Sequence, residues 1–354
     1  MAFSPMDILF VAVRGMSVSQ LLVIAGAMFT RWGWWTPTGS KEVGKIVGEC
    51  LLPLFVFLEF AKPESRDKLK SVGASAEGPL LVGLAVTLML VYLLVGWLLT
   101  QVFSSSKGMQ RAGNVISISV AFGNATALPV MLIGAISNMF AKDDRVFLYL
   151  ATVVYGTINK VIMYTAGSAI CCGKVKLSVL FNKVNIALVL GLLVAFSGDI
   201  SGIDLLPYLH SPGNWLDVVG FLKVLGGMAT PLLQVVMGAS LSKGPKSEDL
   251  DITAISASTF TRLLLCPVIC LIALFLTGVT ASESSSMKVL GFVFLMQSCM
   301  PAASQLSLIA IDSGRVGALQ NMSALLFYHS VFCPLACTGV IAIALQMFAT
   351  APVA

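Results

Sequence analysis

Charged residues are scarce in this chain, and their scarcity excludes a soluble fold. Only 11% of its 354 residues are Asp, Glu, Lys or Arg, whereas 57% are hydrophobic. Soluble domains carry about 25% charged residues, so this composition cannot build a water-facing surface. We therefore expect an all-α, multi-pass integral membrane protein with membrane lipid around it. The endoplasmic reticulum and the plasma membrane are the two locations that we consider, and composition does not choose between them. The net charge of +5 is spread over short loops and indicates no nucleic-acid partner.

Groups that enzymes use are also few. The chain has two histidines, His210 and His329, and neither has an acidic companion that would complete an acid–base or metal site. Its eight cysteines lie mostly in apolar segments, where cysteine packs as a small hydrophobic residue. A Walker motif for nucleotide binding is absent. We therefore expect no enzyme activity, no metal and no cofactor.

Ten segments are apolar and long enough to cross a bilayer, which takes about 20 residues. Five spans in each half make the second half enter the membrane from the opposite side, so we predict an inverted repeat. The expected organisation is a first five-helix repeat over 1–172, a short linker over 173–183 and a second repeat over 184–354. The linker is assigned to the cytosol because more Lys and Arg lie on that side. The expected spans are 7–30, 43–61, 79–102, 112–138, 145–170, 184–200, 215–241, 254–279, 287–310 and 317–348.

One spanning segment occurs twice. Residues 45–55 read KIVGECLLPLF, and residues 223–233 read KVLGGMATPLL, 178 positions later. A second matching pair, Pro129 and Pro301, is separated by 172 positions. Repeated halves with a proline-broken helix in corresponding places are typical of secondary transporters, whose substrate binds where the broken helices meet. The alternative is that each proline only kinks its helix.

Polar residues surround both prolines in the fourth and ninth spans. Proline removes a backbone donor, and backbone groups freed inside a membrane must line a cavity or be buried in protein. Asn124 and Thr126 are suited to satisfy them in the fourth span, as are Ser304 and Gln305 in the ninth. If the two breaks cross, the second half of each helix directs its positive dipole end to the centre. A carboxylate is then the favoured ligand.

Charges within spans usually mark a pathway or a partner. Lys160 lies deep in the fifth span, where it either faces a substrate carboxylate or pairs with Glu49 or Glu59. Aligning the fifth span with the tenth brings Asn159 opposite His329, a histidine that either titrates or is hydrogen-bonded structurally.

Other charged residues have simpler interpretations. Arg14 and Arg262 are expected to reach the membrane surface from near the ends of their spans. Glu77, at the start of the third span, is a candidate proton site or structural residue, as is Glu49. No Asp or Glu stands at either break, which argues against a cation as the primary substrate. Sodium coupling through carbonyl and hydroxyl oxygens stays open.

Three motifs resemble those of the auxin efflux carrier family, and the PIN-LIKES branch is more similar than the PIN-FORMED branch. They are GNATALP at 123–129, ATPLLQVVMGASL at 229–241 and MPAASQLSLIAIDSG at 300–314. The resemblance implies ten helices in two inverted repeats. Spans 1, 2, 6 and 7 would form a scaffold that supports a homodimer, and spans 3–5 and 8–10 a transport domain that moves like an elevator.

The resemblance also implies a substrate and a site. Family members carry organic anions such as indole-3-acetate. The crossing positions correspond to Asn124, Pro129 and Pro301, and the polar positions of the fifth span to Tyr155, Asn159 and Lys160. The expected function is a secondary transporter or facilitator of a small organic anion. The alternatives are a membrane sensor built on a transporter fold and a sodium-coupled organic-anion symporter.

Overall fold

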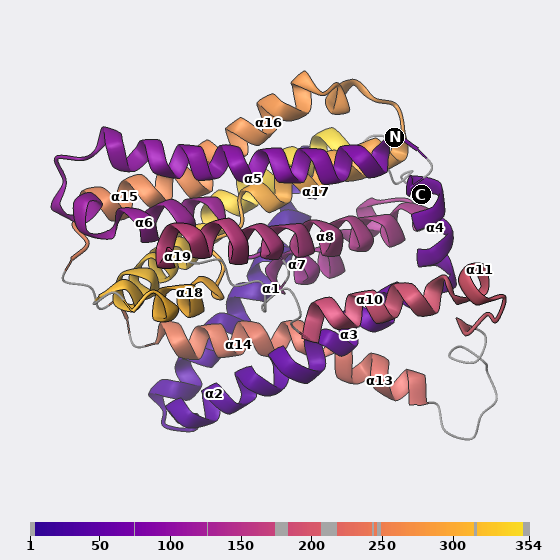
Figure 1. The fold of residues 1–354 in the computed structure, drawn as a ribbon, viewed down its shortest axis with the longest axis horizontal. Helices are drawn as coiled ribbons and strands as arrows, with labels where there is room; N and C mark the ends of the chain where they lie inside the picture. The colour runs from indigo at the N-terminus through magenta and orange to yellow at the C-terminus, as the bar shows by residue number, and fades with distance from the viewer. Residues whose placement is uncertain are drawn as a thin grey trace. The chain divides into compact units, whose positions relative to one another are not determined.

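The computed structural model describes residues 4–73, 75–125, 127–173, 183–206, 218–242, 244–245, 249–314 and 317–349. Over these ranges the chain is helical, without a β-strand, and this confirms the all-α prediction (Figure 1). The helices are interrupted by turns, short 3-10 segments and three five-residue π-helical stretches. Such stretches occur often at functional sites, and one of them carries an arginine described below.

Six helices of the described chain are long and apolar enough to cross a membrane, and they confirm the prediction of an integral multi-pass membrane protein. Two further apolar helices, over 128–139 and 183–195, are shorter. The other expected spans correspond to helices with breaks or changes of type inside them. The six long helices are Pro5–Arg31, Glu77–Val102, Asp144–Cys172, Gly220–Ala239, Ile252–Leu276 and Ala318–Phe348.

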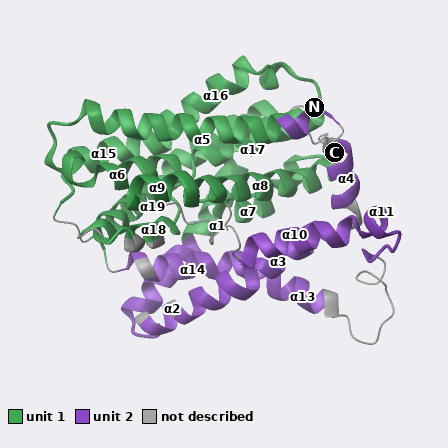
Figure 2. Ribbon diagram, in the orientation of Figure 1, with its two compact units in different colours: residues 1–20, 80–177, 243–354 green, residues 21–79, 178–242 purple. Residues whose placement is uncertain are grey.

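The chain divides into two compact units (Figure 2). Unit 1 consists of Met1–Gln20, Leu80–Leu177 and Lys243–Ala354, and unit 2 of Leu21–Pro79 and Ser178–Ser242. Each unit therefore draws on both halves of the sequence.

Unit 1 is built around α17 (Ser285–Ser298), whose last ten residues are all buried. A helix that is apolar on every face belongs in an interior, and α17 packs against α8 and α19. Gly291 lets α19 approach closely, because a Cβ there would lie 2.5 Å from the ring of Phe348. The other helices of unit 1 are α5 (Glu77–Val102), α6 (Lys107–Ala121), α7 (Ala127–Ile136), α8 (Lys142–Ile162), α9 (Ser168–Cys172), α15 (Ile252–Phe260), α16 (Cys266–Leu276), α18 (Leu306–Asp312) and α19 (Ala318–Phe348). Shorter segments are the 3-10 helices η2 (Ser137–Met139) and η6 (Val279–Ala281) and the π-helices η3 (Met163–Gly167) and η5 (Thr261–Leu265).

Unit 2 is held together by close backbone approaches at glycines. Residues 21–31 of the helix α1 (Pro5–Arg31) belong to unit 2, where they meet α14 (Ala229–Leu241). A Cβ at Gly26 would lie 1.9 Å from the carbonyl oxygen of Val235, and one at Gly238 would lie 1.8 Å from that of Val23. Small residues of this kind let helices pack closely inside membranes. The remaining elements are α2 (Pro37–Ile46), η1 (Val47–Leu51), α3 (Leu52–Phe60), α4 (Pro63–Gly73), α10 (Lys183–Ala195), α11 (Ser197–Ser201) and α13 (Val218–Gly227).

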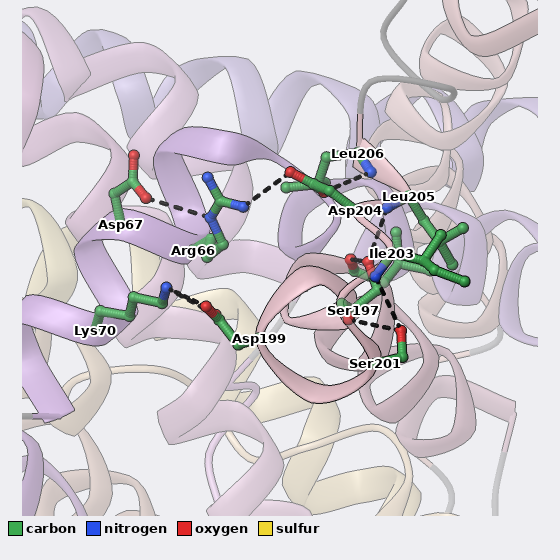
Figure 3. Close-up of polar contacts among 11 residues, drawn as sticks. Arg66, Asp67, Lys70, Ser197, Asp199, Ser201, Ile203, Asp204, Leu205 and Leu206 are labelled. Carbon is green, nitrogen blue, oxygen red and sulfur yellow. Dashed lines mark hydrogen bonds and ion pairs between the residues drawn. The ribbon is translucent and has the colours of Figure 1, made fainter.

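Polar contacts connect α4 to the segment around α11 (Figure 3). Arg66 donates to Asp204 at 3.2 Å, and Lys70 pairs with Asp199 at 2.7 Å. Asp204 also accepts the backbone N–H of Leu206, which fixes the turn after α11. Pairs that are partly or fully exposed to solvent add little stability each, so this cluster orders a surface turn rather than the core of unit 2.

Candidate functional site

Two non-helical segments cross inside unit 1. The first lies between α6 and α7, and the second between α17 and α18. Gly123 and Ala302 form an antiparallel β-bridge. The N–H of Asn124 donates to the carbonyl of Pro301 at 2.7 Å, and the N–H of Ala303 donates to the carbonyl of Phe122 at 2.9 Å. The two breaks therefore satisfy part of each other's backbone.

The prolines occupy different places in these breaks. Pro129 lies in the first turn of α7, where a helix does not use the backbone N–H. Pro301 lies in the non-helical segment itself, and its carbonyl accepts the bond from Asn124. Thr126 lies outside the described residues.

Two buried amides support the first break from neighbouring helices. Asn159 on α8 donates through Nδ2 to the carbonyl of Gly123 at 3.2 Å. Gln297 on α17 donates through Nε2 to the carbonyl of Ala125 at 3.1 Å. Both side chains are almost completely buried. These bonds hold carbonyl groups that a regular helix would satisfy itself.

Arg262 corrects one prediction from the sequence. It was expected to reach the membrane surface, but only 2% of the residue is exposed. Its Nε donates to the carbonyl of Met300 at 2.7 Å and its Nη1 to that of Val120 at 2.9 Å. Its Nη2 lies 3.3 Å from the carbonyl of Gln297. The guanidinium also lies over the ring of Tyr92, 5.9 Å from its centre. A planar group with five donors suits several carbonyls at once, so the side chain turns inward instead.

Arg262 places a positive charge at two helix ends. The carbonyls that it binds belong to the C-terminal ends of α6 and α17, which carry partial negative charge. The opposite halves, α7 and α18, begin after the breaks and contribute partial positive charge there. The arginine thereby compensates the negative ends of α6 and α17.

Gly123 is required at the crossing for steric reasons. A Cβ built at this position would lie 1.9 Å from Nη2 of Arg262 and 3.2 Å from the carbonyl oxygen of Met300. Only glycine leaves room for the guanidinium beside the β-bridge.

The sequence held a signal for Arg262 that the interpretation missed. The residue lies near the middle of the Ile252–Leu276 helix rather than at its end. A charge at that depth is costly in a bilayer and usually faces a protein interior. Which groups it meets could not be predicted, because they come from α6 and α17.

Lys160 follows Asn159 on α8 and is 95% buried. Of the two carboxylates considered as its structural partners, Glu49 pairs with Lys183 at 2.7 Å and Glu59 with Lys62 at 2.6 Å. Neither carboxylate therefore pairs with Lys160 in these contacts. That Lys160 contacts the substrate stays a prediction.

The other predicted site residues are distributed over unit 1. Tyr155 is buried on α8, with its ring edge-on to Phe294 at 5.6 Å. Ser304 is exposed and Gln305 half-buried, both in the turn before α18. Ser304 thus lies directly after the crossing pair.

His329 and Glu77 lie in polar contacts of their own. His329 is fully buried on α19, and its Nε2 lies 3.1 Å from the hydroxyl of Ser258. Glu77 begins α5 and accepts a hydrogen bond from Ser75. Among the described residues there is no group of three or more His, Cys, Asp or Glu that could hold a metal ion.

Comparisons with known proteins point to membrane transport. The family model described as "Membrane transport protein" matches residues 16–175. The PIN-LIKES 2 protein of Arabidopsis thaliana is 31% identical over 122 residues, which are 34% of this chain and 26% of that protein. The chain thus matches about a quarter of the length of this relative. Both findings confirm the resemblance to the auxin efflux carrier family that the motifs predicted.

Proposed function

We propose, from the family that this chain resembles and from the crossing in unit 1, that it is a secondary transporter or facilitator of a small organic anion. The substrate binds at the crossing of the two interrupted helices, and access alternates by an elevator-type movement. The matching family is one of transporters rather than enzymes. The observation that carries the proposal is the crossing itself. Arg262 compensates the negative ends of α6 and α17 there, and the positive ends of α7 and α18 would attract an anion.

The proposal includes a ten-span inverted repeat. In it, α6 with α7 forms the fourth span, and α17 with α18 forms the ninth. The division into units supports the assignment of moving and static parts. Unit 1 contains the expected spans 3–5 and 8–10, while unit 2 contains spans 2, 6 and 7 and the later part of span 1. Unit 1 would be the transport domain, and unit 2 the scaffold through which two copies associate.

Three side chains are proposed to contact the substrate. Asn124 contributes its amide beside the crossing, Ser304 its hydroxyl, and Lys160 a positive charge for the carboxylate. Lys160 is buried, so an anion that reaches it meets the ammonium in a low-dielectric interior and is attracted more strongly than at the surface.

Uptake by proteoliposomes tests the proposal. Labelled organic anions, including indole-3-acetate, are supplied to vesicles with wild type, Asn124→Ala or Asn138→Ala. The alanine at 124 keeps the backbone bond to Pro301 and removes only the amide. Asn138 is exposed in η2 and provides the same substitution away from the crossing. Saturable uptake that is lost in Asn124→Ala and kept in Asn138→Ala is expected.

Two outcomes would contradict the proposal. Folded wild-type protein that carries no anion of the panel would exclude the organic-anion assignment and favour a sensor or a carrier of another solute class. Uptake that is equal in both variants would exclude the crossing as the site. Repeating the assay with and without a sodium gradient separates a sodium-coupled symporter from a facilitator.

A further inference from the structure

An apolar groove of about 780 Å³ runs along the outside of unit 1, between α15–η5 and α19. It is separate from the crossing and plays no part in the proposed transport. Large side chains such as Phe260, Phe332 and Leu335 line it, and these are 59%, 52% and 84% exposed. In an integral membrane protein such a surface faces lipid or another protein.

Small residues create the depth of the groove. Ser256 lines it from α15, and Ala336 and Gly339 line it from α19. A Cβ built at Gly339 would meet nothing within 4 Å. Helix packing therefore does not require this glycine. Its effect is to leave space.

The length of the groove matches a lipid tail. Its lining residues extend from Ile252 to Leu264 on one side, about 18 Å of helix, and from Tyr328 to Ile343 on the other, about 22 Å. The hydrocarbon core of a bilayer is about 30 Å thick, so the tails of one leaflet fill about 15 Å. A groove of this length accommodates one extended chain.

The polar end of the groove carries one ion pair and one hydrogen-bonded carboxylate. Next to Ile252, the carboxylate of Asp251 accepts from the hydroxyl of Ser106 and from the N–H of Gly108. Asp249 pairs with Arg111 at 3.2 Å. Both carboxylates already have partners within the protein, so this end of the groove is not built to bind one particular headgroup.

From these observations we propose that the groove is a binding site for one acyl chain of a membrane glycerophospholipid, chosen by its tail rather than by its headgroup charge. The occupied groove keeps α15 and α19 apart along their exposed edges while the helices stay joined at Ser258 and His329.

Photolabelling in nanodiscs tests this site. The probe is phosphatidylcholine with a photoreactive group in the middle of one tail, and labelled peptides are identified by mass spectrometry. In wild type, we expect more label on the residues of α15 and α19 that line the groove than on the exposed face of α5. Gly339→Leu should lose most of this label, because its side chain fills the open space. Gly83→Leu, at an exposed α5 glycine whose Cβ also meets nothing, should keep it.

A further variant and a second lipid probe distinguish an acyl chain from other ligands of the groove. The hydroxyl of Thr259, which lines the groove, is buried and has no hydrogen-bond partner within the described residues. Thr259→Val should leave labelling unchanged for an acyl chain, and a loss would instead indicate a ligand with a polar group there. Phosphatidylglycerol with the same tail should label as well as phosphatidylcholine.

The proposal would be overturned by label spread evenly over all exposed helices, which means ordinary surrounding lipid. It would also be overturned by unchanged label in a folded Gly339→Leu variant, or by cross-links between α19 of two copies in place of lipid adducts. Thermal unfolding of each variant verifies that loss of label does not reflect loss of the fold.

Discussion

At the scale of single residues, the one side chain of Arg262 donates hydrogen bonds to several backbone carbonyls of the crossing. Its guanidinium binds carbonyls from both interrupted helices, and Gly123 leaves the space for it. Buried charges are tolerated when they are hydrogen-bonded and compensated. Here the compensation comes from helix ends and from the ring of Tyr92, because within the described residues this side chain binds carbonyl oxygens.

Replacing Arg262 by Leu should destabilise the protein strongly. The substitution leaves several buried carbonyls without donors, each costing about 1–3 kcal/mol. We expect a clear fall in the melting temperature of the purified protein, together with loss of uptake.

Arg14→Leu is the matched control, since Arg14 is an exposed residue of α1. It should melt like wild type. An Arg262→Leu variant with unchanged melting temperature would show that the carbonyls are satisfied in another way, and the role given to the arginine would be wrong.

At the scale of elements, most helices follow from local features of the sequence. The long apolar runs predicted the spans at 7–30, 79–102 and 317–348 closely, because hydrophobic length alone decides whether a helix can cross a bilayer. Contacts between distant residues are different. Gln297 binds Ala125, 172 positions away, and no local pattern encodes that bond. The sequence therefore marks Asn124 as polar and Pro301 as helix-breaking, but it does not give the groups that their backbones bind.

The N-terminus of α15 provides a test with pH. Asp251 accepts from the hydroxyl of Ser106 and from the N–H of Ala254, and these bonds lower the pKa of its carboxyl. A lowered pKa means that the charged form is more stable in the folded state than in the unfolded state. This contribution is complete above the ordinary Asp pKa of about 3.9. It is lost as the pH falls through the folded pKa.

Asp251→Asn should keep a good helix cap but remove the charge. We expect a loss of about 1 kcal/mol near neutral pH, the scale of a charge at a helix N-terminus. Melting curves from pH 7 downward should show the difference between wild type and variant shrinking below pH 4. Glu283→Gln, in an exposed loop, should show no such difference. A difference in melting temperature between wild type and Asp251→Asn that persists below pH 4 would contradict the electrostatic explanation.

At the scale of the whole molecule, the chain builds two units from interleaved parts of its sequence. The internal repeat indicated two similar halves, yet neither half forms a unit alone. Which segments associate depends on packing surfaces such as the glycine contacts between α1 and α14. Those contacts could not be predicted, because isolated glycines in apolar helices have no sequence signature that names a partner.

Gly238→Ala should disrupt unit 2. Its Cβ would lie 1.8 Å from the carbonyl oxygen of Val23, and overpacking of this kind costs about 1–3 kcal/mol. Gly227→Ala, where a Cβ meets nothing within 4 Å, should be neutral or slightly stabilising, since alanine favours helix. Expression yield and melting temperature provide the readout. Equal stability of the two variants would contradict the close packing of α1 on α14.

The backbone pairing at the crossing bears on how such proteins diverge. Asn124, Pro301 and Ala303 hold the two breaks together through main-chain atoms, and those bonds do not depend on the side chains. Descendants of one ancestral gene can exchange side chains around the crossing and acquire new specificities while they inherit the same frame. Gly123 and Arg262 mark the limit of that freedom, because one needs the absence of a side chain and the other needs its full length.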